Sequence, residues 1–278
     1  MRTVTLPGGE QVPALGQGTW KMGEGRQSRE TETAALRLGI DLGLTLIDTA
    51  EMYGEGEAEK VVGKAIAGQR ERVFLVSKVY PHNASRRGIP AAWERSARRM
   101  GVDVIDLYLL HWRGPVPLAE TVAAFEALKQ AGRIRHWGVS NCDTDDMEEL
   151  LAVPGGRDCA ANQVLYSPEH RGIEFDLLPW QARQKILVMA YSPVGQGGRL
   201  LRAPALARVA ARHAATPAQA ALAWALRQSG VIAIPKAGTA AHVRENAAAA
   251  AVALTGEDLA EIDGAFPKPT RRQPLAML

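Results

Sequence analysis

The sequence predicts an α/β fold of the (β/α)8 TIM-barrel type, in which eight parallel strands close into a cylinder inside a ring of helices. Three observations support this prediction. Short apolar segments alternate with helical segments along the chain, which is typical of βαβ units and a parallel sheet. Eight such units fit a chain of 278 residues, because barrels of this kind usually take about 250 residues. No linker-like or low-complexity stretch divides the sequence, so we expect one domain over residues 1–278.

A doubly wound open sheet is the alternative α/β arrangement. It would require a glycine-rich turn between the first strand and the first helix, where the backbone approaches a pyrophosphate closely. The nearest match, Gly54-x-Gly56, lies outside that context and lacks the third glycine. The barrel is therefore the better prediction.

The chain begins with a predicted β-hairpin over residues 3–12, because two short extended segments flank the turn Pro7-Gly8-Gly9. Each later strand is a short apolar run followed by polar or small residues. We expect strands at residues 14–18, 45–47, 73–76, 106–110, 134–139, 161–164, 186–190 and 231–234.

The predicted helices carry apolar residues at helical spacing and have recognisable ends. Gly43 and Gly101 follow two of them, and Thr216 with Pro217 marks the start of another. The prediction includes extra helices in the C-terminal part of the chain. We expect helices at residues 30–42, 58–67, 85–100, 118–129, 145–151, 175–184, 204–214, 217–228, 240–250 and 257–265.

The composition argues against several classes of protein. The formal net charge is +3 with 23% charged residues, and no Lys/Arg block or basic stripe indicates a nucleic-acid partner. Cys142 and Cys159 form neither a disulfide framework nor a metal-binding spacing. The N-terminus lacks an apolar signal core, and no apolar run reaches membrane length. We expect a soluble, cytoplasmic protein, a monomer, with no metal, nucleic-acid or membrane partner.

Four polar residues lie near strand ends at one end of the predicted barrel. Asp48 follows the second strand, and Tyr53 lies in the loop after it. Lys78 follows the third strand and His111 the fourth. In such barrels the catalytic residues gather at the C-terminal ends of the strands, and consecutive strands are neighbours. We therefore expect these four side chains to converge.

The residue types indicate a proton donor. A free tyrosine has a pKa of about 10, and we expect the ammonium of Lys78 to lower the pKa of Tyr53 by favouring the phenolate. Asp48 would pair with Lys78, and a neutral His111 could hydrogen-bond a carbonyl oxygen. Such a site protonates an oxygen while another group attacks the carbonyl carbon. Because none of the four is placed as a nucleophile with its own base, we expect a hydride-donating cofactor.

Each of these residues has an ordinary structural alternative. Asp48 could cap a turn, and Tyr53 could lie on the rim. Lys78 could be solvated, and His111 could be a core residue. Taken singly these alternatives are preferred, but together, at three successive strand ends, the residues favour catalysis. Two rival functions stay open: an aldolase-like lyase that forms a Schiff base on Lys78, and a non-catalytic cofactor-sensing subunit.

Several segments of the chain resemble the aldo-keto reductase family. They are GQGTW (16–20), LIDTAEMYGEGEAEKVVGKAI (46–66), VSKVY (76–80), DLYLLHW (106–112), GRIRHWGVSN (132–141), NQVLYSP (162–168), AYSPVGQGG (190–198) and IPKAGTAAHVRENAAA (234–249). The resemblance covers nearly the whole chain and is strongest to bacterial methylglyoxal reductases. It implies a (β/α)8 barrel and NADPH-dependent reduction of aldehydes and ketones, with methylglyoxal a leading substrate. It also implies a catalytic tetrad with Tyr53 as proton donor: Asp48, Tyr53, Lys78 and His111.

The same resemblance implies contacts with NADPH. Ser140, Asn141 and Gln163 would bind the nicotinamide carboxamide, and Tyr191 would stack on the nicotinamide ring. The loop after Tyr191 would cover the pyrophosphate, and Lys236 would pair with the 2′-phosphate. The implied cofactor-binding residues are Ser140, Asn141, Gln163, Tyr191, Ser192, Pro193, Val194, Gly195, Lys236, Thr239, His242, Glu245 and Asn246.

Two positions depart from the family pattern near the 2′-phosphate. His242 stands where many members have an arginine, and a mostly neutral histidine cannot form the bidentate guanidinium contact. Ala237 replaces a common serine donor. We therefore expect NADPH preference to persist through Lys236 but to weaken, with some use of NADH.

Three aromatic residues are predicted to wall the substrate pocket. Trp20, Tyr80 and Trp112 follow strand ends, and an aromatic wall suits small carbonyl compounds. The tail over residues 267–278 is short, so we expect an open mouth. Arg271 and Arg272 in that tail are expected to be solvated.

Overall fold

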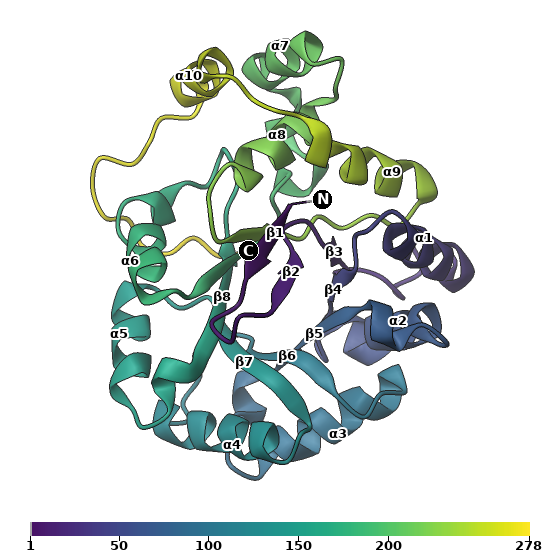
Figure 1. Cartoon of the computed structure of the whole chain (residues 1–278), viewed down its shortest axis with the longest axis vertical. Coiled ribbons are helices and arrows are strands. Elements are labelled where there is room, and N and C mark those ends of the chain that lie inside the picture. Colours follow the sequence, from purple (N-terminus) through teal and green to yellow (C-terminus); the bar gives the residue numbers. More distant parts are fainter. Residues whose placement is uncertain (1) are drawn as a thin grey trace.

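The computed structural model describes residues 2–278 as a barrel of parallel strands ringed by helices (Figure 1). The central sheet has eight strands, and their spatial order follows the chain from β3 to β10. Every neighbouring pair is parallel, as expected for successive βαβ units. The strands are β3 (Gln17–Gly18), β4 (Leu46–Asp48), β5 (Phe74–Val79), β6 (Ile105–Leu110), β7 (Ile134–Ser140), β8 (Cys159–Leu165), β9 (Leu187–Tyr191) and β10 (Val231–Ala233).

The first and last parts of the sheet meet and close the barrel. The Gly16 N–H donates to the Ala233 carbonyl at 2.9 Å, and the Ala233 N–H donates to the Ala14 carbonyl at 2.8 Å. A Cβ atom at Gly18 would lie 2.7 Å from the Ile234 carbonyl oxygen, so glycine is required for this close approach. The predicted closed barrel is confirmed.

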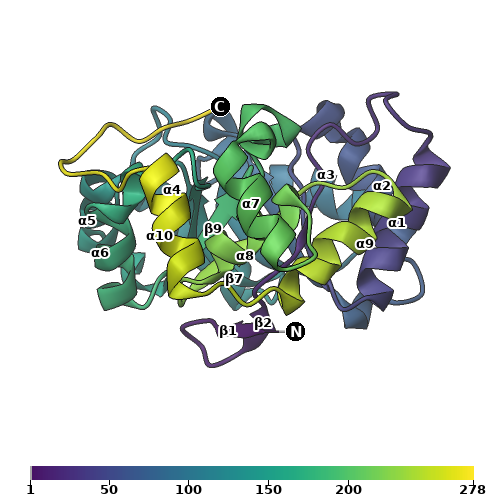
Figure 2. The ribbon, with the colours of Figure 1, turned by 90° about the horizontal axis from the view of Figure 1, so that it is seen from above.

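Helices surround the strands on the outside of the barrel (Figure 1). Arg212 of α7 (Pro204–Arg212) donates to Asp258 of α10 (Gly256–Ala265) at 2.8 Å, which joins the two helices that lie beyond the repeating units (Figure 2). No helix within residues 2–278 has both the length and the apolar character needed to cross a membrane. The helices are α1 (Arg29–Asp41), α2 (Glu57–Ile66), α3 (Gly88–Met100), α4 (Leu118–Gln130), α5 (Thr144–Ala152), α6 (Leu177–Gln184), α7 (Pro204–Arg212), α8 (Pro217–Leu226), α9 (Ala240–Ala248) and α10 (Gly256–Ala265).

The strand boundaries differ from the prediction where polar residues lie inside a strand. β5 runs to Val79, beyond the predicted range of 73–76, and β4 ends at Asp48 rather than before it. Lys78 is fully buried within the sheet, although its charge indicated the end of a strand. A charge inside a strand is tolerated here because it is paired, as the site geometry shows below.

The predicted N-terminal hairpin is present and plugs one end of the barrel. It consists of β1 (Thr3–Thr5) and β2 (Gln11–Pro13), which pair in antiparallel register. Its apolar side chains pack against strand residues inside the barrel, and each such buried side chain contributes about 1.5–3 kcal/mol. Figure 2 shows the hairpin and the C-terminal end of the chain on opposite faces. The inner cluster contains Val4, Leu6, Val12, Leu46, Phe74, Val76, Leu107, Leu109, Met189 and Ile232.

Candidate active site

A buried lysine lies at the centre of the polar end of the barrel. The Lys78 ammonium donates to Asp48 Oδ2 at 2.8 Å and to the Tyr53 hydroxyl at 3.1 Å. It also donates to the Thr49 carbonyl at 2.9 Å. These contacts use all three donors of an ammonium. The predicted convergence of the carboxylate, the phenol and the amine is present in the structure.

The strand register explains this convergence. β4 and β5 pair in parallel with Asp48 opposite Val76, so Lys78 lies further along β5, near the residues that follow β4. Tyr53 begins a short 3-10 turn (Tyr53–Gly56) in which Gly54 has a φ of 56°. That left-handed conformation favours glycine. The turn keeps the tyrosine ring buried beside the strand end.

Asp48 accepts hydrogen bonds from two sides of the barrel. Its Oδ2 faces Lys78, and its Oδ1 accepts from the Gln163 side-chain amide of β8 at 2.8 Å. Burial raises the pKa of Asp48, and the charge of Lys78 opposes this effect. Burial disfavours the charge of Lys78, but attraction to Asp48 and Tyr53 outweighs burial and raises the pKa of the lysine. The amine is therefore held as an ammonium.

The expected lowering of the Tyr53 pKa is wrong in its net direction. Burial raises the pKa of Tyr53 above its ordinary value, and the Lys78 ammonium lowers it by less than burial raises it. The sequence could not show how completely the phenol is buried. Tyr53 is therefore a neutral phenol at physiological pH, and Lys78 lies where it stabilises the phenolate that remains after proton loss.

His111 follows β6 and faces the tyrosine. Its ring lies edge-on to the Tyr53 ring, with the centroids 5.7 Å apart and the planes at 75°. Burial lowers the pKa of His111 to about 2, and the nearby Lys78 charge acts in the same direction. Its Nδ1 is buried and has no hydrogen-bond partner within residues 2–278. The imidazole is neutral, as the sequence predicts.

Four residues implied as nicotinamide contacts form one hydrogen-bonded set beside His111. The Tyr191 hydroxyl donates to Asn141 Oδ1 at 3.0 Å, and Asn141 Nδ2 donates to the His111 carbonyl at 3.1 Å. The Ser140 hydroxyl donates to the Gln163 carbonyl at 2.8 Å. The ends of β7, β8 and β9 are thereby joined next to the tetrad.

The loop implied to cover the pyrophosphate has an irregular backbone. Ser192 has a φ of 47°, Gly195 of 58° and Gly197 of 72°. Pro193 and Val194 lie between the first two of these turns. Glycine at such positions allows the backbone to approach a ligand closely. The loop is compatible with phosphate binding through main-chain groups.

Lys236, implied as the 2′-phosphate contact, is half-buried just after β10. Burial lowers its pKa, and Glu32 opposes this effect, while the charges of Arg26 and Lys21 lower the pKa further. Arg26 and Lys21 therefore lie near Lys236, although the sequence alone did not single them out. Both residues belong to the segment that follows β3, the first strand of the barrel. This segment reaches Lys236 only because the barrel closes.

The remaining implied cofactor contacts lie in the first turns of α9. Thr239 is the N-cap of α9, and its hydroxyl accepts the His242 N–H at 3.4 Å. His242 is exposed on that first turn. Glu245 and Asn246 follow in the next turn, and Asn246 is buried. These residues thus lie on one helix and its N-cap.

Two of the three predicted wall residues contact each other. The Tyr80 ring lies edge-on to the Trp112 ring, with the centroids 5.9 Å apart. The centroids of the Trp112 and His111 rings are 4.9 Å apart. Both aromatic rings are half-buried. Trp20 is also half-buried and lies beneath the Lys21 ammonium, 4.0 Å from the ring centroid.

A buried carboxylate that the sequence did not single out holds this wall. Glu51 accepts from the Tyr80 backbone N–H at 2.9 Å, from the Asn83 amide at 3.0 Å and from Arg95 at 3.2 Å. Glu51 lies two residues before Tyr53 in the same sequence motif, and this position could have indicated its role from the sequence. Glu51 therefore links the loop after β4 to the loop that carries Tyr80.

The C-terminal tail ends on the face of the barrel opposite the hairpin (Figure 2). The backbone N–H of Leu278 lies close enough to Tyr191 to lower the pKa of its hydroxyl, although burial dominates and raises that pKa to about 12. Arg272, expected to be solvated, forms ion pairs with Asp145 at 3.0 Å and Asp176 at 3.1 Å. The tail is therefore anchored at the starts of α5 and α6.

Comparison with known proteins gives a consistent result. Residues 14–266 match the model of the aldo/keto reductase family. The chain is 53% identical to methylglyoxal reductase YeaE of Escherichia coli K12, over 100% of this chain and 99% of that protein. It is 35% identical to the glyoxal reductase of Bacillus subtilis, covering 94% of this chain and 91% of that protein.

Solved structures give the same result at the level of the fold. The crystal structure of an aldo/keto reductase from Klebsiella pneumoniae in complex with NADP and acetate is 51% identical in sequence. It superposes with a TM-score of 0.97 over 99% of both chains. A second structure of the Klebsiella pneumoniae enzyme, in complex with NADPH, also gives a TM-score of 0.97. The chain is an oxidoreductase that belongs to the aldo/keto reductase family.

Proposed function

We propose that this protein reduces aldehydes and ketones to alcohols with NADPH, and that small dicarbonyl compounds such as methylglyoxal are its leading substrates. The observation that carries the proposal is the Lys78 ammonium, which hydrogen-bonds both the Asp48 carboxylate and the Tyr53 hydroxyl. A neutral phenol whose conjugate base is stabilised by an ammonium is a suitable acid for a carbonyl oxygen.

The residues present fit a nicotinamide dinucleotide phosphate. The Asn141 side-chain amide lies at the Tyr191 hydroxyl, and the Gln163 amide lies at Asp48, which suits a carboxamide and an aromatic face. Lys236, with Arg26 and Lys21 near it, supplies positive charge for a phosphate. The name and the bound cofactor of the Klebsiella relative support NADPH here.

The bound cofactor supplies the hydride for the carbonyl carbon. In this proposal Tyr53 gives its proton to the carbonyl oxygen, and Lys78 stabilises the resulting phenolate. Asp48 keeps the ammonium charged and oriented. Neutral His111 donates a hydrogen bond that holds the carbonyl oxygen near the phenol. Tyr80 and Trp112 form an apolar side of the pocket that suits a small substrate.

A Schiff-base mechanism on Lys78 is disfavoured by the same geometry. A nucleophilic lysine needs a lowered pKa, whereas the pKa of Lys78 is raised by Asp48 and Tyr53. A non-catalytic role is disfavoured because all four tetrad side chains are present, and hydrogen bonds join Lys78 to Asp48 and Tyr53.

We also propose that residues 1–278 act as one NADPH-dependent domain that works as a cytoplasmic monomer. The continuous sheet from β3 to β10 supports the single unit. Light scattering at several concentrations tests the monomer, and a stable dimer mass would refute it.

NADPH oxidation against a panel of carbonyl compounds tests the proposed function. We expect kcat/KM to be highest for methylglyoxal and related small dicarbonyls, lower for aromatic aldehydes and lowest for sugars. NADH should support a slower reaction with the same substrates. Failure of every carbonyl to oxidise NADPH, or borohydride trapping of substrate on Lys78, would overturn the proposal.

A further inference from the structure

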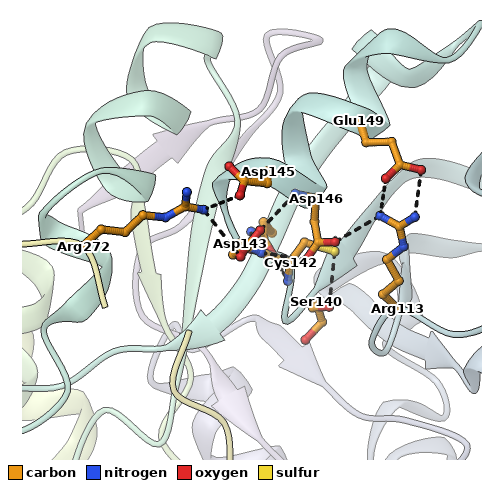
Figure 3. Close-up of polar contacts among 9 residues, drawn as sticks. Arg113, Ser140, Cys142, Asp143, Asp145, Asp146, Glu149 and Arg272 are labelled. Atoms are coloured by element: carbon orange, nitrogen blue, oxygen red, sulfur yellow. Dashed lines mark hydrogen bonds and ion pairs between the residues drawn. The ribbon is translucent and has the colours of Figure 1, made fainter. Parts of the chain in front are cut away.

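The N-terminal turns of α5 carry four carboxylates that two arginines contact from different parts of the chain (Figure 3). We call this group the α5 cluster, and its members are Asp143, Asp145, Asp146 and Glu149. Asp143 and Asp146 already form a capping box at the helix start, with Asp143 accepting the Asp146 N–H at 2.9 Å. Carboxylates at this position are also favoured by the helix dipole. The cluster is therefore a preformed part of the helix.

The first arginine comes from the loop that follows β6. Arg113 donates to both oxygens of Glu149 at 2.7 Å and to Asp146 at 3.0 Å (Figure 3). A paired guanidinium–carboxylate contact of this kind fixes orientation as well as distance. Arg113 directly follows Trp112, whose ring contacts His111. One wall of the substrate pocket is thus tied to α5.

The second arginine comes from the C-terminal tail. Arg272 lies 3.0 Å from Asp145 and 3.6 Å from Asp143 (Figure 3). Its Nε lies 3.1 Å from Asp176. Asp176 is the N-cap of α6 and accepts the Thr144 hydroxyl at 2.9 Å. The arginine therefore joins the tail to the starts of two adjacent helices.

Beyond this anchor the tail runs toward the reaction centre. Leu275 is half-buried and packs against the hydrophobic core, and the chain ends on the face of the barrel opposite the hairpin (Figure 2). Met277 and Leu278 have exposed fractions of 52% and 68%. An apolar chain end on this face of the barrel can contact a ligand. The last residues of the tail therefore follow directly on the Arg272 anchor and end on the face that lies opposite the hairpin.

We infer that the α5 cluster is the shared anchor for two sides of the substrate mouth, and that Arg113 and Arg272 are positioning residues for substrate selection. This inference depends on the proposed function, because it assigns the selectivity of that same site. Both arginines are partly exposed, with side-chain exposures of 34% for Arg113 and 44% for Arg272. Such ion pairs contribute little to global stability. Their effect is therefore expected on the shape of the mouth and not on folding.

The test compares Arg272→Met with Arg271→Met, a matched change at the exposed neighbouring arginine. KM and kcat are measured with NADPH for methylglyoxal and for the bulkier phenylglyoxal. We expect Arg272→Met to reduce the preference in kcat/KM for methylglyoxal about five-fold, mainly through KM, as the loss of one partly exposed ion-pair site allows. Arg271→Met should match the wild type, and Arg272→Lys should restore part of the preference.

A second set of measurements tests Arg113, in the loop after β6, and the effect of salt on the wild-type preference. Arg113→Met should change the same preference, and Arg113→Lys should rescue it incompletely because lysine lacks the bidentate geometry. About 0.5 M NaCl should shift the wild type toward the Arg272→Met values, because salt screens exposed charges. The dissociation constant for NADPH and the melting temperature should not change in either variant.

The outcomes separate this inference from the proposed function. Wild-type turnover of carbonyls with NADPH supports the function whatever the variants do. If Arg272→Met and Arg113→Met equal Arg271→Met in both substrates, the positioning role is refuted while the reductase stands. If either variant instead loses NADPH binding or melts at a clearly lower temperature, the arginines are general structural residues and the inference is also refuted.

Discussion

The side-chain amide of Gln163 donates a 2.8 Å hydrogen bond to Asp48 across the barrel. Both residues are buried, and Asp48 uses its other oxygen for Lys78. A residue implied as a cofactor contact therefore also satisfies the carboxylate of the tetrad. This contact links the end of β8 to the end of β4.

Gln163→Met is expected to destabilise the protein as well as to weaken cofactor binding. The change removes a buried hydrogen bond to a charged group, which costs about 1.5–3 kcal/mol. Urea denaturation measures the free energy of unfolding. Gln184→Met, at an exposed position of α6, is the control and should stay near the wild-type value. Equal stability of the two variants would show that Asp48 does not depend on Gln163.

Tyr53→Phe is expected to remove most turnover and spare NADPH binding. The phenol is the proposed proton donor, and general acid catalysis contributes about 10²–10⁴-fold in rate. Steady-state NADPH oxidation measures the rate, and quenching of tryptophan fluorescence measures binding. Full activity of the variant would exclude Tyr53 as the acid.

Lys78→Met is expected to cost about 3–5 kcal/mol in the free energy of unfolding, because it leaves a buried carboxylate without its partner. The double change Asp48→Leu with Lys78→Met should recover a large part of that loss, since both charges are then removed. Chemical denaturation of wild type, single and double variants measures the effect. A double variant that is less stable than Lys78→Met would contradict this interpretation of the pair.

His111 makes stability depend on pH in a defined direction. Its pKa falls from 6.5 to about 2 in the folded protein, so below pH 6.5 the unfolded chain binds a proton that the folded chain does not. Keeping His111 neutral therefore costs no stability above the unfolded pKa of 6.5, and the free energy of unfolding falls as the pH drops below that value. From pH 7 to pH 5 the loss is about 2 kcal/mol for this group.

Unfolding of His111→Gln measures that contribution. The difference in stability between pH 7 and pH 5 should be smaller in the variant than in the wild type. His82→Gln, at an exposed position, should leave the difference unchanged. A wild-type slope retained in His111→Gln would mean that the buried histidine is not its source.

Lys236→Met is expected to abolish most of the preference for NADPH over NADH. The ammonium is the implied partner of the 2′-phosphate, and its loss should raise KM for NADPH far more than KM for NADH. The ratio of the two kcat/KM values measures the preference. Arg26→Met should lower the same ratio to a smaller extent, because Arg26 lies near Lys236. An unchanged ratio in Lys236→Met would refute the assignment.

The order of the elements and the positions of the reactive residues could be predicted from the sequence. Alternating apolar segments and helical segments predicted the barrel because both patterns are local, with one period for strands and another for helices. Asp48, Lys78 and His111 were found because each lies at or next to the end of its own strand. Their convergence follows from any closed barrel in which consecutive strands are neighbours.

Features that depend on burial and on distant contacts could not be predicted from local sequence patterns. The pKa of Tyr53 rises because burial outweighs the ammonium, and the extent of burial is not encoded in any local pattern. The contact of Gln163 with Asp48, the approach of Arg26 to Lys236 and the anchoring of Arg272 join residues far apart in the chain. Only closure of the cylinder and packing of the tail bring such groups within reach, and these are properties of the whole fold.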